Sequence, residues 1–318
     1  GIFAENQAMK WLVKLTGLPE GAFGVFTSGG TEANLSAMVT ARETWRSKHP
    51  EKTNTRGIVI ASNAAHSSIS AMAKVIDADV CLIQTEDRLE GANLARTISE
   101  MSAEDRSRVF AIIATGGTTN SGIIDDLAGI AQVAKDENVW FHVDAAYGGG
   151  ALAARSVRHL FKGIEEANSI TVDPHKWLFS PYDCGAVIYR EPELAKRTHS
   201  QEGSYLDIFT DEGAKGFNPS DYQIQLTRRL RGLPLWFSLA MHGTDRYETA
   251  VERGIELARI AGRLINEADH VELVREPSLS CVLFRRIGWS PEEYKAWTYR
   301  NHKAGFALIT PTKWRNPA

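Results

Sequence analysis

The stretch VWFHVDAAYG, residues 139–148, carries the pattern on which the fold prediction rests. Its first part is a mostly apolar, β-rich run, and Asp144 follows directly at the end of that run. The same pattern recurs where Ile170-Thr-Val172 is followed by Asp-Pro-His-Lys176. A short apolar run rich in β-branched residues that ends at a polar turn is typical of a strand buried in a parallel sheet.

Further runs of this kind extend outward in both directions, at residues 58–61, 80–83, 109–114 and 186–189, with a shorter one ending at Phe26. Helical spacing separates several of them, for example at Leu35, Met38 and Trp45. Strands alternating with helices predict an α/β fold with a mostly parallel sheet and helices on both faces. The run at 186–189 follows its predecessor too closely for a crossover helix, so we expect it to be antiparallel.

The pattern changes after about residue 235, where a long helix near 247–265 is followed by a β run at 280–285. We therefore expect a large α/β domain over residues 1–235 and a smaller, incomplete α+β domain over 236–318. Residues 198–222 form the longest stretch without clear periodicity. A loop of this length in a compact protein is usually functional or mobile.

Composition excludes several classes of protein. The chain has 318 residues, 43% of them hydrophobic, and a net charge of −3, which gives no electrostatic footprint for nucleic acid or for a membrane surface. The 3 cysteines are far apart, which argues against a disulfide scaffold and a cysteine zinc site, and we expect no metal. The few cysteines and the missing leader predict a cytoplasmic protein.

Polar and glycine residues follow the predicted strands at the edge where open α/β sheets bind ligands. The set comprises a glycine-rich anion cradle, a histidine, a threonine, an acid and a lysine, and pyridoxal 5′-phosphate is a ligand that uses all of them. They are Ser28-Gly29-Gly30-Thr31, Ser62 to His66, Thr115 to Thr119, Asp144, and Asp173 to Lys176.

The first strand end suits a phosphate, which needs backbone N–H donors at a helix N-terminus and a backbone that can approach closely. Ser28, Gly29 and Gly30 open a helix at Thr31 and offer both features. The alternative is a simple helix cap after a tight turn. The run is neither a Walker A loop nor a GxGxxG dinucleotide fingerprint.

The charged residues that follow two of the predicted strands, Asp144 and Lys176, suit the ring and the aldehyde of pyridoxal phosphate. A carboxylate such as Asp144 beside the ring nitrogen favours the protonated ring, which is an electron sink. Lys176 lies 32 residues later, one crossover unit away, and its amine can form an imine with the aldehyde. A capping acid and a solvated lysine are the alternatives. His66 can stack on the ring or be structural, and Thr115 can contact the cofactor or cap a helix.

At residues 27–34, 142–148 and 173–177 the chain resembles the group II pyridoxal-phosphate-dependent amino-acid decarboxylases. The resemblance continues through residues 221–229 and 311–314. It implies the fold type I of this cofactor class, with a seven-stranded-type sheet and a smaller C-terminal α+β lobe. It also implies a homodimer, and a preceding dimerisation segment that this chain lacks.

The resemblance also implies roles for individual residues. Lys176 would bind the aldehyde, Asp144 the ring nitrogen, and His66 and Ala146 the two ring faces. Tyr222 would return a proton to the α-carbon, with Tyr205 as the second candidate and His66 as another. The remaining cofactor contacts would be Ser28, Gly29, Gly30, Thr115 and His175. One departure is Asp173, where several members carry Asn: this acid would repel the phosphate unless it pairs with a cation.

The implied reaction converts an L-amino acid to its amine and carbon dioxide. Trp177 and residues 182–185 look closer to the aromatic branch, so an aromatic substrate is preferred. No isolated arginine marks a clamp for a side-chain carboxylate, although Arg228, Arg229 and Arg231 stay candidates. The alternatives are glutamate, diaminobutyrate or aspartate decarboxylation, aldehyde synthesis, transamination, Cα–Cβ cleavage, and a catalytically dead homologue.

Overall fold

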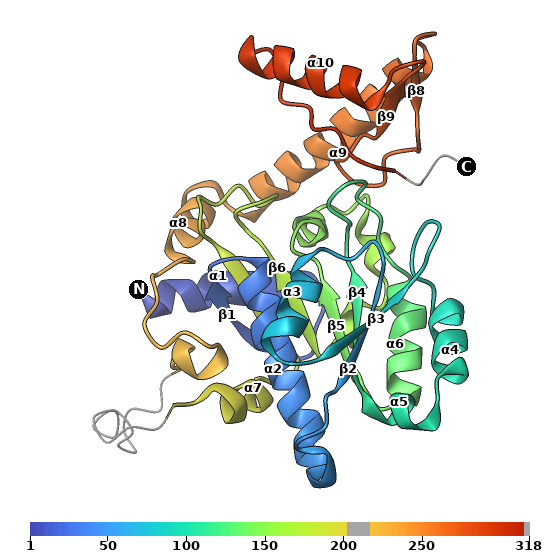
Figure 1. Cartoon of the computed structure of the whole chain (residues 1–318). Helices are drawn as coiled ribbons and strands as arrows, with labels where there is room; N and C mark the ends of the chain where they lie inside the picture. The colour runs from blue at the N-terminus through green and yellow to red at the C-terminus, as the bar shows by residue number, and fades with distance from the viewer. Residues whose placement is uncertain (202–216, 315–318) are drawn as a thin grey trace. The chain divides into compact units, whose positions relative to one another are not determined.

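The computed structural model describes residues 1–201 and 217–314 (Figure 1). These residues form two compact units, one made of the described residues within 1–119 and 123–252, the other of residues 120–122 and 253–314. The division expected between a large domain over residues 1–235 and a smaller one over 236–318 stays a prediction. No helix of the described ranges is long and apolar enough to cross a lipid bilayer.

A seven-stranded sheet forms the centre of the first unit, in the order β1-β7-β6-β5-β4-β2-β3. Strands β3, β2, β4, β5 and β6 are mutually parallel, whereas β7 pairs antiparallel with both β6 and β1. The mostly parallel sheet and its antiparallel late strand are therefore confirmed. The strands are β1 Phe23–Thr27, β2 Ile58–Ser62, β3 Asp79–Ile83, β4 Val109–Thr115, β5 Trp140–Asp144, β6 Ser169–Val172 and β7 Gly185–Tyr189.

Helices cover both faces of this sheet, as expected. One face packs against α2 and α3, and the other carries α6, with α4 beside α6 (Figure 1). The link from β5 to β6 holds only short 3-10 turns instead of an α-helix, and the first of these turns begins with three glycines, which disfavour an α-helix. The helices of this unit are α1 Ile2–Thr16, α2 Gly30–Lys48, α3 Ser68–Val75, α4 Gly91–Glu100, α5 Ala103–Arg108, α6 Leu127–Asp136, α7 Pro192–His199 and α8 Leu233–His242.

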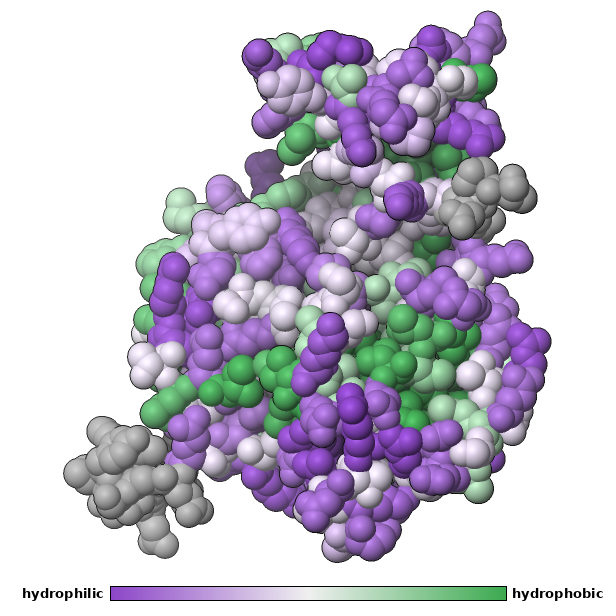
Figure 2. All heavy atoms as spheres, in the orientation of Figure 1, coloured by the Kyte–Doolittle hydropathy of each residue, from purple (hydrophilic) through white to green (hydrophobic). Residues whose placement is uncertain are grey.

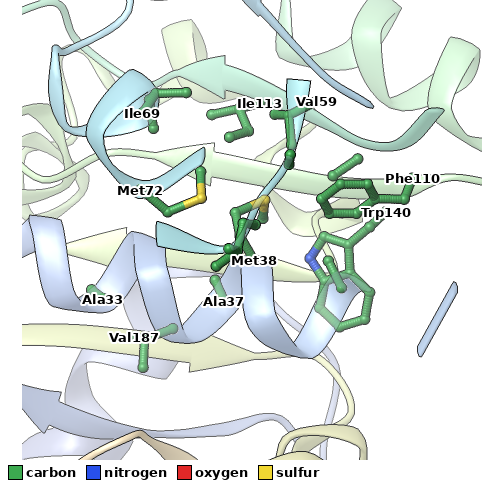
Figure 3. Packing of buried hydrophobic residues seen from close by; sticks show 14 of the residues in the cluster. Ala33, Ala37, Met38, Val59, Ile69, Met72, Phe110, Ile113, Trp140 and Val187 are labelled. Carbon is green, nitrogen blue, oxygen red and sulfur yellow. The ribbon is translucent and has the colours of Figure 1, made fainter. Parts of the chain in front are cut away.

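The main core lies between the sheet and the pair α2 and α3 (Figure 3). Alternate strand residues such as Val59 and Ala61 point into it, because successive side chains of a strand face opposite sides. Met38 of α2 is completely buried at its centre, and the Trp45 and Phe110 rings lie 6.1 Å apart at its edge. This packing holds α2 firmly against the sheet.

The second unit contains the long helix α9 for most of its length, and the helix expected near 247–265 is confirmed. Its small antiparallel sheet pairs β8 with β9, and a capping box of Ser290 and Glu293 begins α10. The β run expected at 280–285 is only partly correct, because pairing begins at Phe284. The elements are α9 Thr244–Asn266, β8 Val271–Leu273, β9 Phe284–Arg286 and α10 Pro291–Lys303.

We predict that Met38→Ala lowers the free energy of unfolding by about 2–5 kcal/mol, because it leaves a cavity in a core that cannot collapse fully. Urea unfolding of the variant measures this loss. The control is Met241→Ala on α8, whose side chain is 77% exposed and should change stability by no more than about 0.5 kcal/mol. Equal effects of the two changes would contradict the described core.

Candidate active site

A cavity of about 320 Å³ lies at the carboxyl edge of the sheet in the first unit. Its walls come from the ends of β1, β4, β5 and β6, from the start of α2 and from the loop after β2. Every residue expected to hold the cofactor lines this cavity, namely Ser28, Gly29, Gly30, His66, Thr115, Asp144, Ala146, His175 and Lys176. The structure thus brings together residues that are scattered over 149 positions of sequence, from 28 to 176.

The N-terminus of α2 forms the anion-binding end of the cavity. The first amides of a helix have no carbonyl partner within the helix, so those that begin α2 at Gly30 are suited to an anion. A Cβ added at Gly30 would lie 3.0 Å from the Ala146 Cβ and 3.1 Å from the Asp173 carboxylate. Glycine at this position therefore allows the start of α2 to lie close to Ala146 and Asp173.

His175 completes this end of the cavity. Its Nδ1 accepts the backbone N–H of Cys184 at 3.0 Å, so the neutral ring carries its proton on Nε2. Burial lowers the pKa of His175 below its ordinary value, which favours this neutral form. The ring can therefore donate a hydrogen bond from Nε2 to a phosphate oxygen.

Ser28 is bound to a partner that the sequence analysis missed. Its N–H and hydroxyl both donate to Glu32 Oε2, at 2.7 and 2.6 Å. Glu32 is the third residue of α2 and reaches back over the helix start, as acids at this position often do. A phosphate that binds Ser28 has to replace this contact with Glu32. The contact could have been expected from the sequence, because Glu32 stands in the first turn of the predicted helix.

Thr115 ends β4 and presents a buried hydroxyl oxygen that has no protein partner in the described ranges. Its backbone N–H donates to Asp125 Oδ2 at 2.7 Å, while Asp125 Oδ1 accepts the N–H of Leu89 at 2.8 Å. Burial raises the pKa of Asp125 to about 6. The hydrogen bond to Asp125 thereby holds Thr115 at the cavity wall. The hydroxyl of Thr115 can there form a hydrogen bond with a ligand.

Lys176 and Asp173 form an ion pair, with the Lys176 Nζ 2.8 Å from Asp173 Oδ2. The lysine side chain is 39% exposed, whereas that of Asp173 is almost completely buried. An acid at position 173 was expected to repel the phosphate unless it paired with a cation, and Lys176 is that cation. The pair also holds the amine of Lys176 at the cavity.

Asp144 ends β5 and is only 7% exposed. Its Oδ1 accepts the Ala146 N–H at 3.1 Å, and its Oδ2 accepts the Asn34 side-chain amide at 2.9 Å. Strands β5 and β6 are neighbours, so Asp144 and Lys176 do follow adjacent strand ends, as predicted. The sequence analysis did not identify Asn34 as a partner of Asp144. A polar amide between the core residues Ala33 and Ala37 of α2 could have indicated a buried hydrogen bond there.

His66 is exposed on the loop after β2, and its Nδ1 accepts the Ser68 N–H at 3.1 Å. Its neutral ring can therefore donate from Nε2. His66 and Ala146 both line the cavity, whereas their contacts with the two faces of a cofactor ring stay a prediction.

The structure does not bring Tyr222 to this cavity. Tyr222 is only 7% exposed and belongs to the core that packs against α2, where its ring stacks on Phe217 with ring centroids 4.6 Å apart. Burial raises the pKa of its hydroxyl. Tyr205 lies outside the described residues, so the expected role of either tyrosine as a proton donor stays a prediction.

The donor set fits pyridoxal phosphate. A helix N-terminus that begins with glycine suits the phosphate, a buried acid that accepts two hydrogen bonds suits a protonated ring nitrogen, and a lysine amine suits the aldehyde. Within the part of the chain that the structure describes, the buried Thr115 hydroxyl and Asp173 Oδ1 have no hydrogen-bond partner, so both can interact with a ligand.

Comparisons with known proteins agree with this geometry. A sequence model described as pyridoxal-dependent decarboxylase conserved domain matches residues 2–287. An aromatic-L-amino-acid decarboxylase of Bacillus atrophaeus is 33% identical over 89% of this chain and 59% of its own length. An L-2,4-diaminobutyrate decarboxylase of Rhizobium meliloti is 34% identical over 89% of this chain and 57% of its own length. The chain thus spans less than two thirds of these relatives.

Solved structures show the same fold. Oryza sativa TDC, solved with PLP and tryptamine, has a TM-score of 0.88 at 26% identity, covering 98% of this chain and 69% of that chain. Mouse CSAD has a TM-score of 0.83 at 29% identity, covering 97% of this chain and 68% of that chain. These likenesses confirm fold type I, and the matching family confirms the cofactor inferred from the strand ends.

We predict a pH-dependent contribution of Asp125 to stability. Because its pKa rises from 3.8 to about 6 on folding, the folded chain binds this proton more tightly, and stability from this group falls as pH rises through that window. The unfolding free energy of the wild type relative to Asp125→Asn should therefore fall by about 2–3 kcal/mol between about pH 4 and pH 7.

Urea unfolding at a series of pH values measures this difference, with the exposed Asp136→Asn on α6 as the control for general charge effects. A difference between wild type and Asp125→Asn that stays constant, or grows with pH, would contradict the assignment.

Proposed function

Since this chain belongs to the pyridoxal-dependent decarboxylase family, we propose that the complete protein removes the α-carboxylate of an L-amino acid as carbon dioxide and releases the amine. The observation that carries the proposal is the convergence of Lys176, Asp144 and the glycine cradle on one cavity. Because the chain spans only part of its relatives, the activity belongs to the complete protein.

Pyridoxal phosphate, when bound, supplies a ring that takes up the electron pair released as a bond to the α-carbon breaks. The start of α2 and His175 would hold its phosphate, and Thr115 would offer a further hydroxyl. Asp144 places negative charge beside the ring nitrogen. Lys176 provides the amine that binds the aldehyde, with Asp173 as its countercharge. His66, at the exposed rim, can hold a proton on Nε2 for return to the α-carbon.

An aromatic amino acid is the substrate class we propose. None of the described residues that line the cavity is an arginine, so an acidic side chain finds no guanidinium there. Arg228 pairs with Glu5, while Arg229 and Arg231 both pair with Asp183. These pairs argue against the three arginines as a free carboxylate clamp.

Tyr147 supports the aromatic preference, because it lines the cavity and stacks on Trp177 with ring centroids 5.3 Å apart. An aromatic ring in the cavity wall can stack on a planar aromatic side chain of the substrate. The second candidate is L-2,4-diaminobutyrate. It is favoured by Glu32, which lines the cavity and whose buried Oε1 has no hydrogen-bond partner among the described residues, so this oxygen can accept a side-chain ammonium.

We also propose that two copies of the complete protein associate next to this site. Phe179 and Tyr182 follow Lys176 closely and are 58% and 78% exposed, which is unusual for large apolar side chains beside a cavity. The Tyr182 ring lies 4.5 Å from the His175 ring. Figure 2 shows further apolar side chains gathered on the face around α3 and β3, where Val75 and Leu82 are exposed. Light scattering of the complete protein tests for a dimer.

We predict that borohydride reduction of the cofactor-loaded complete protein leaves a pyridoxyl label on Lys176, located by peptide mapping. Lys176→Ala should lose the label and several orders of magnitude of carbon dioxide release. Lys135→Ala, which removes an exposed lysine on α6, should keep both. A label on a different lysine would reject the site, and a keto acid or an aldehyde as the main product would reject simple decarboxylation.

A substrate panel tests the proposed class. Carbon dioxide release from Tyr, Trp, Phe and dopa should exceed that from glutamate and diaminobutyrate by at least about 10-fold in kcat/KM, the discrimination that one favourable pocket contact supplies. Faster release from diaminobutyrate would favour the second candidate.

A further inference from the structure

A line of buried polar side chains runs from the start of β5 to Asp144. Trp140 Nε1 lies 2.8 Å from Ser169 Oγ, and this hydroxyl lies 2.7 Å from His142 Nδ1. His142 Nε2 lies 3.0 Å from Asn34 Oδ1, and Asn34 Nδ2 lies 2.9 Å from Asp144 Oδ2. His142, Ser169 and Asn34 are completely buried.

Strand geometry explains why these residues meet. Alternation along β5 puts Trp140, His142 and Asp144 on one face, and the same face of the neighbouring β6 carries Ser169. Asn34 reaches this face from α2, which packs against the sheet. The line is therefore built by three separate elements.

The direction of each hydrogen bond follows from chemistry. An indole N–H can only donate, and an ionised carboxylate can only accept. Asn34 must then turn its Nδ2 to Asp144 and its Oδ1 to His142, so His142 Nε2 carries a hydrogen. Burial lowers the pKa of His142 to about 4, which leaves Nδ1 free to accept from Ser169. Every donor in the line points toward Asp144.

Asn34 has no freedom to rotate. Its second amide hydrogen donates to Ser68 Oγ at 3.3 Å, and its Oδ1 also accepts the Thr171 hydroxyl at 2.7 Å. All four of its hydrogen-bonding positions are thus used. A fully satisfied buried amide holds the carboxylate in one orientation.

We propose that Asn34 and His142 are positioning residues, which orient Asp144 and stabilise its negative charge so that the carboxylate faces the ring nitrogen of the cofactor. Donors aligned head to tail polarise one another and strengthen the last bond, which is made to a charged acceptor. A neutral His142 adds no positive charge that would compete with the ring N–H. The inference rests on the proposed function, because it takes the cofactor to bind with its ring nitrogen at Asp144.

The test compares two ligands on the complete protein: pyridoxal phosphate and its deaza analogue, in which C–H replaces the ring nitrogen. Equilibrium titration gives the ratio of their dissociation constants. The wild type should prefer pyridoxal phosphate, and Asn34→Ala should reduce that preference by about 10- to 100-fold, the value of a hydrogen bond to a charged group. The ¹⁵N chemical shift of the labelled ring nitrogen should move toward the unprotonated form in the same variant.

The matched control is Asn168→Ala. Asn168 precedes β6 and its Oδ1 accepts the Phe141 N–H at 2.8 Å, so the change deletes a similar side-chain amide that bonds to the same strand, β5, outside the line. It should leave the preference between the two ligands unchanged. If Asn34→Ala does not fold, Trp140→Phe removes only the most distant donor and should reduce the preference about 2- to 5-fold.

Equal weakening of both ligands in Asn34→Ala, or an unchanged preference in Trp140→Phe where that variant is needed, would overturn the inference. So would a wild type that binds both ligands equally. A wild type that binds neither ligand at Lys176 would instead reject the proposed function, so the two failures are distinguishable.

Discussion

The common direction of the strands is the constraint on which the site depends. Because β7 pairs antiparallel with both β6 and β1, β1 runs in the same direction as β6, and its carboxyl end reaches the same edge of the sheet. This places the start of α2 beside the ends of β5 and β6. The pairing requires glycine at position 24, where a Cβ would lie 2.1 Å from the Val187 carbonyl oxygen. With β1 reversed, the anion cradle would lie at the opposite edge from Lys176.

The acids around the cavity are compatible with burial because each has a donor or a cation. Asp144 accepts two N–H groups, Asp173 pairs with Lys176, and Glu32 accepts two hydrogens from Ser28. An uncompensated carboxylate in such a place would cost several kcal/mol (about 3–5 kcal/mol when a partner is removed). Among the described residues that line the cavity, Asp173 Oδ1, Glu32 Oε1 and the Thr115 hydroxyl are buried without a hydrogen-bond partner.

Much of the fold and of the site could be predicted from local patterns. The apolar runs before Asp144 and Asp173 marked β5 and β6, and chain polarity alone put the residues that follow them at one edge. The partners of those residues could not be predicted in this way. Asn34 and Asp144 are 110 positions apart, and whether they meet depends on how α2 packs on the sheet. Tyr222 is the last residue of the longest stretch without clear periodicity, yet its ring stacks on Phe217 within the core.

The sequence by itself determined the kind of chemistry: a glycine turn, a histidine, an acid and a lysine, each shortly after an apolar run, indicated one cofactor before any packing was known. Only the tertiary structure decided which side chains support that chemistry. It paired Asp173 with Lys176, engaged Ser28 with Glu32, and aligned His142 and Asn34 behind Asp144. The physical reason is that periodicity reports which face of an element is buried, whereas a hydrogen bond between elements depends on strand order, direction and register together.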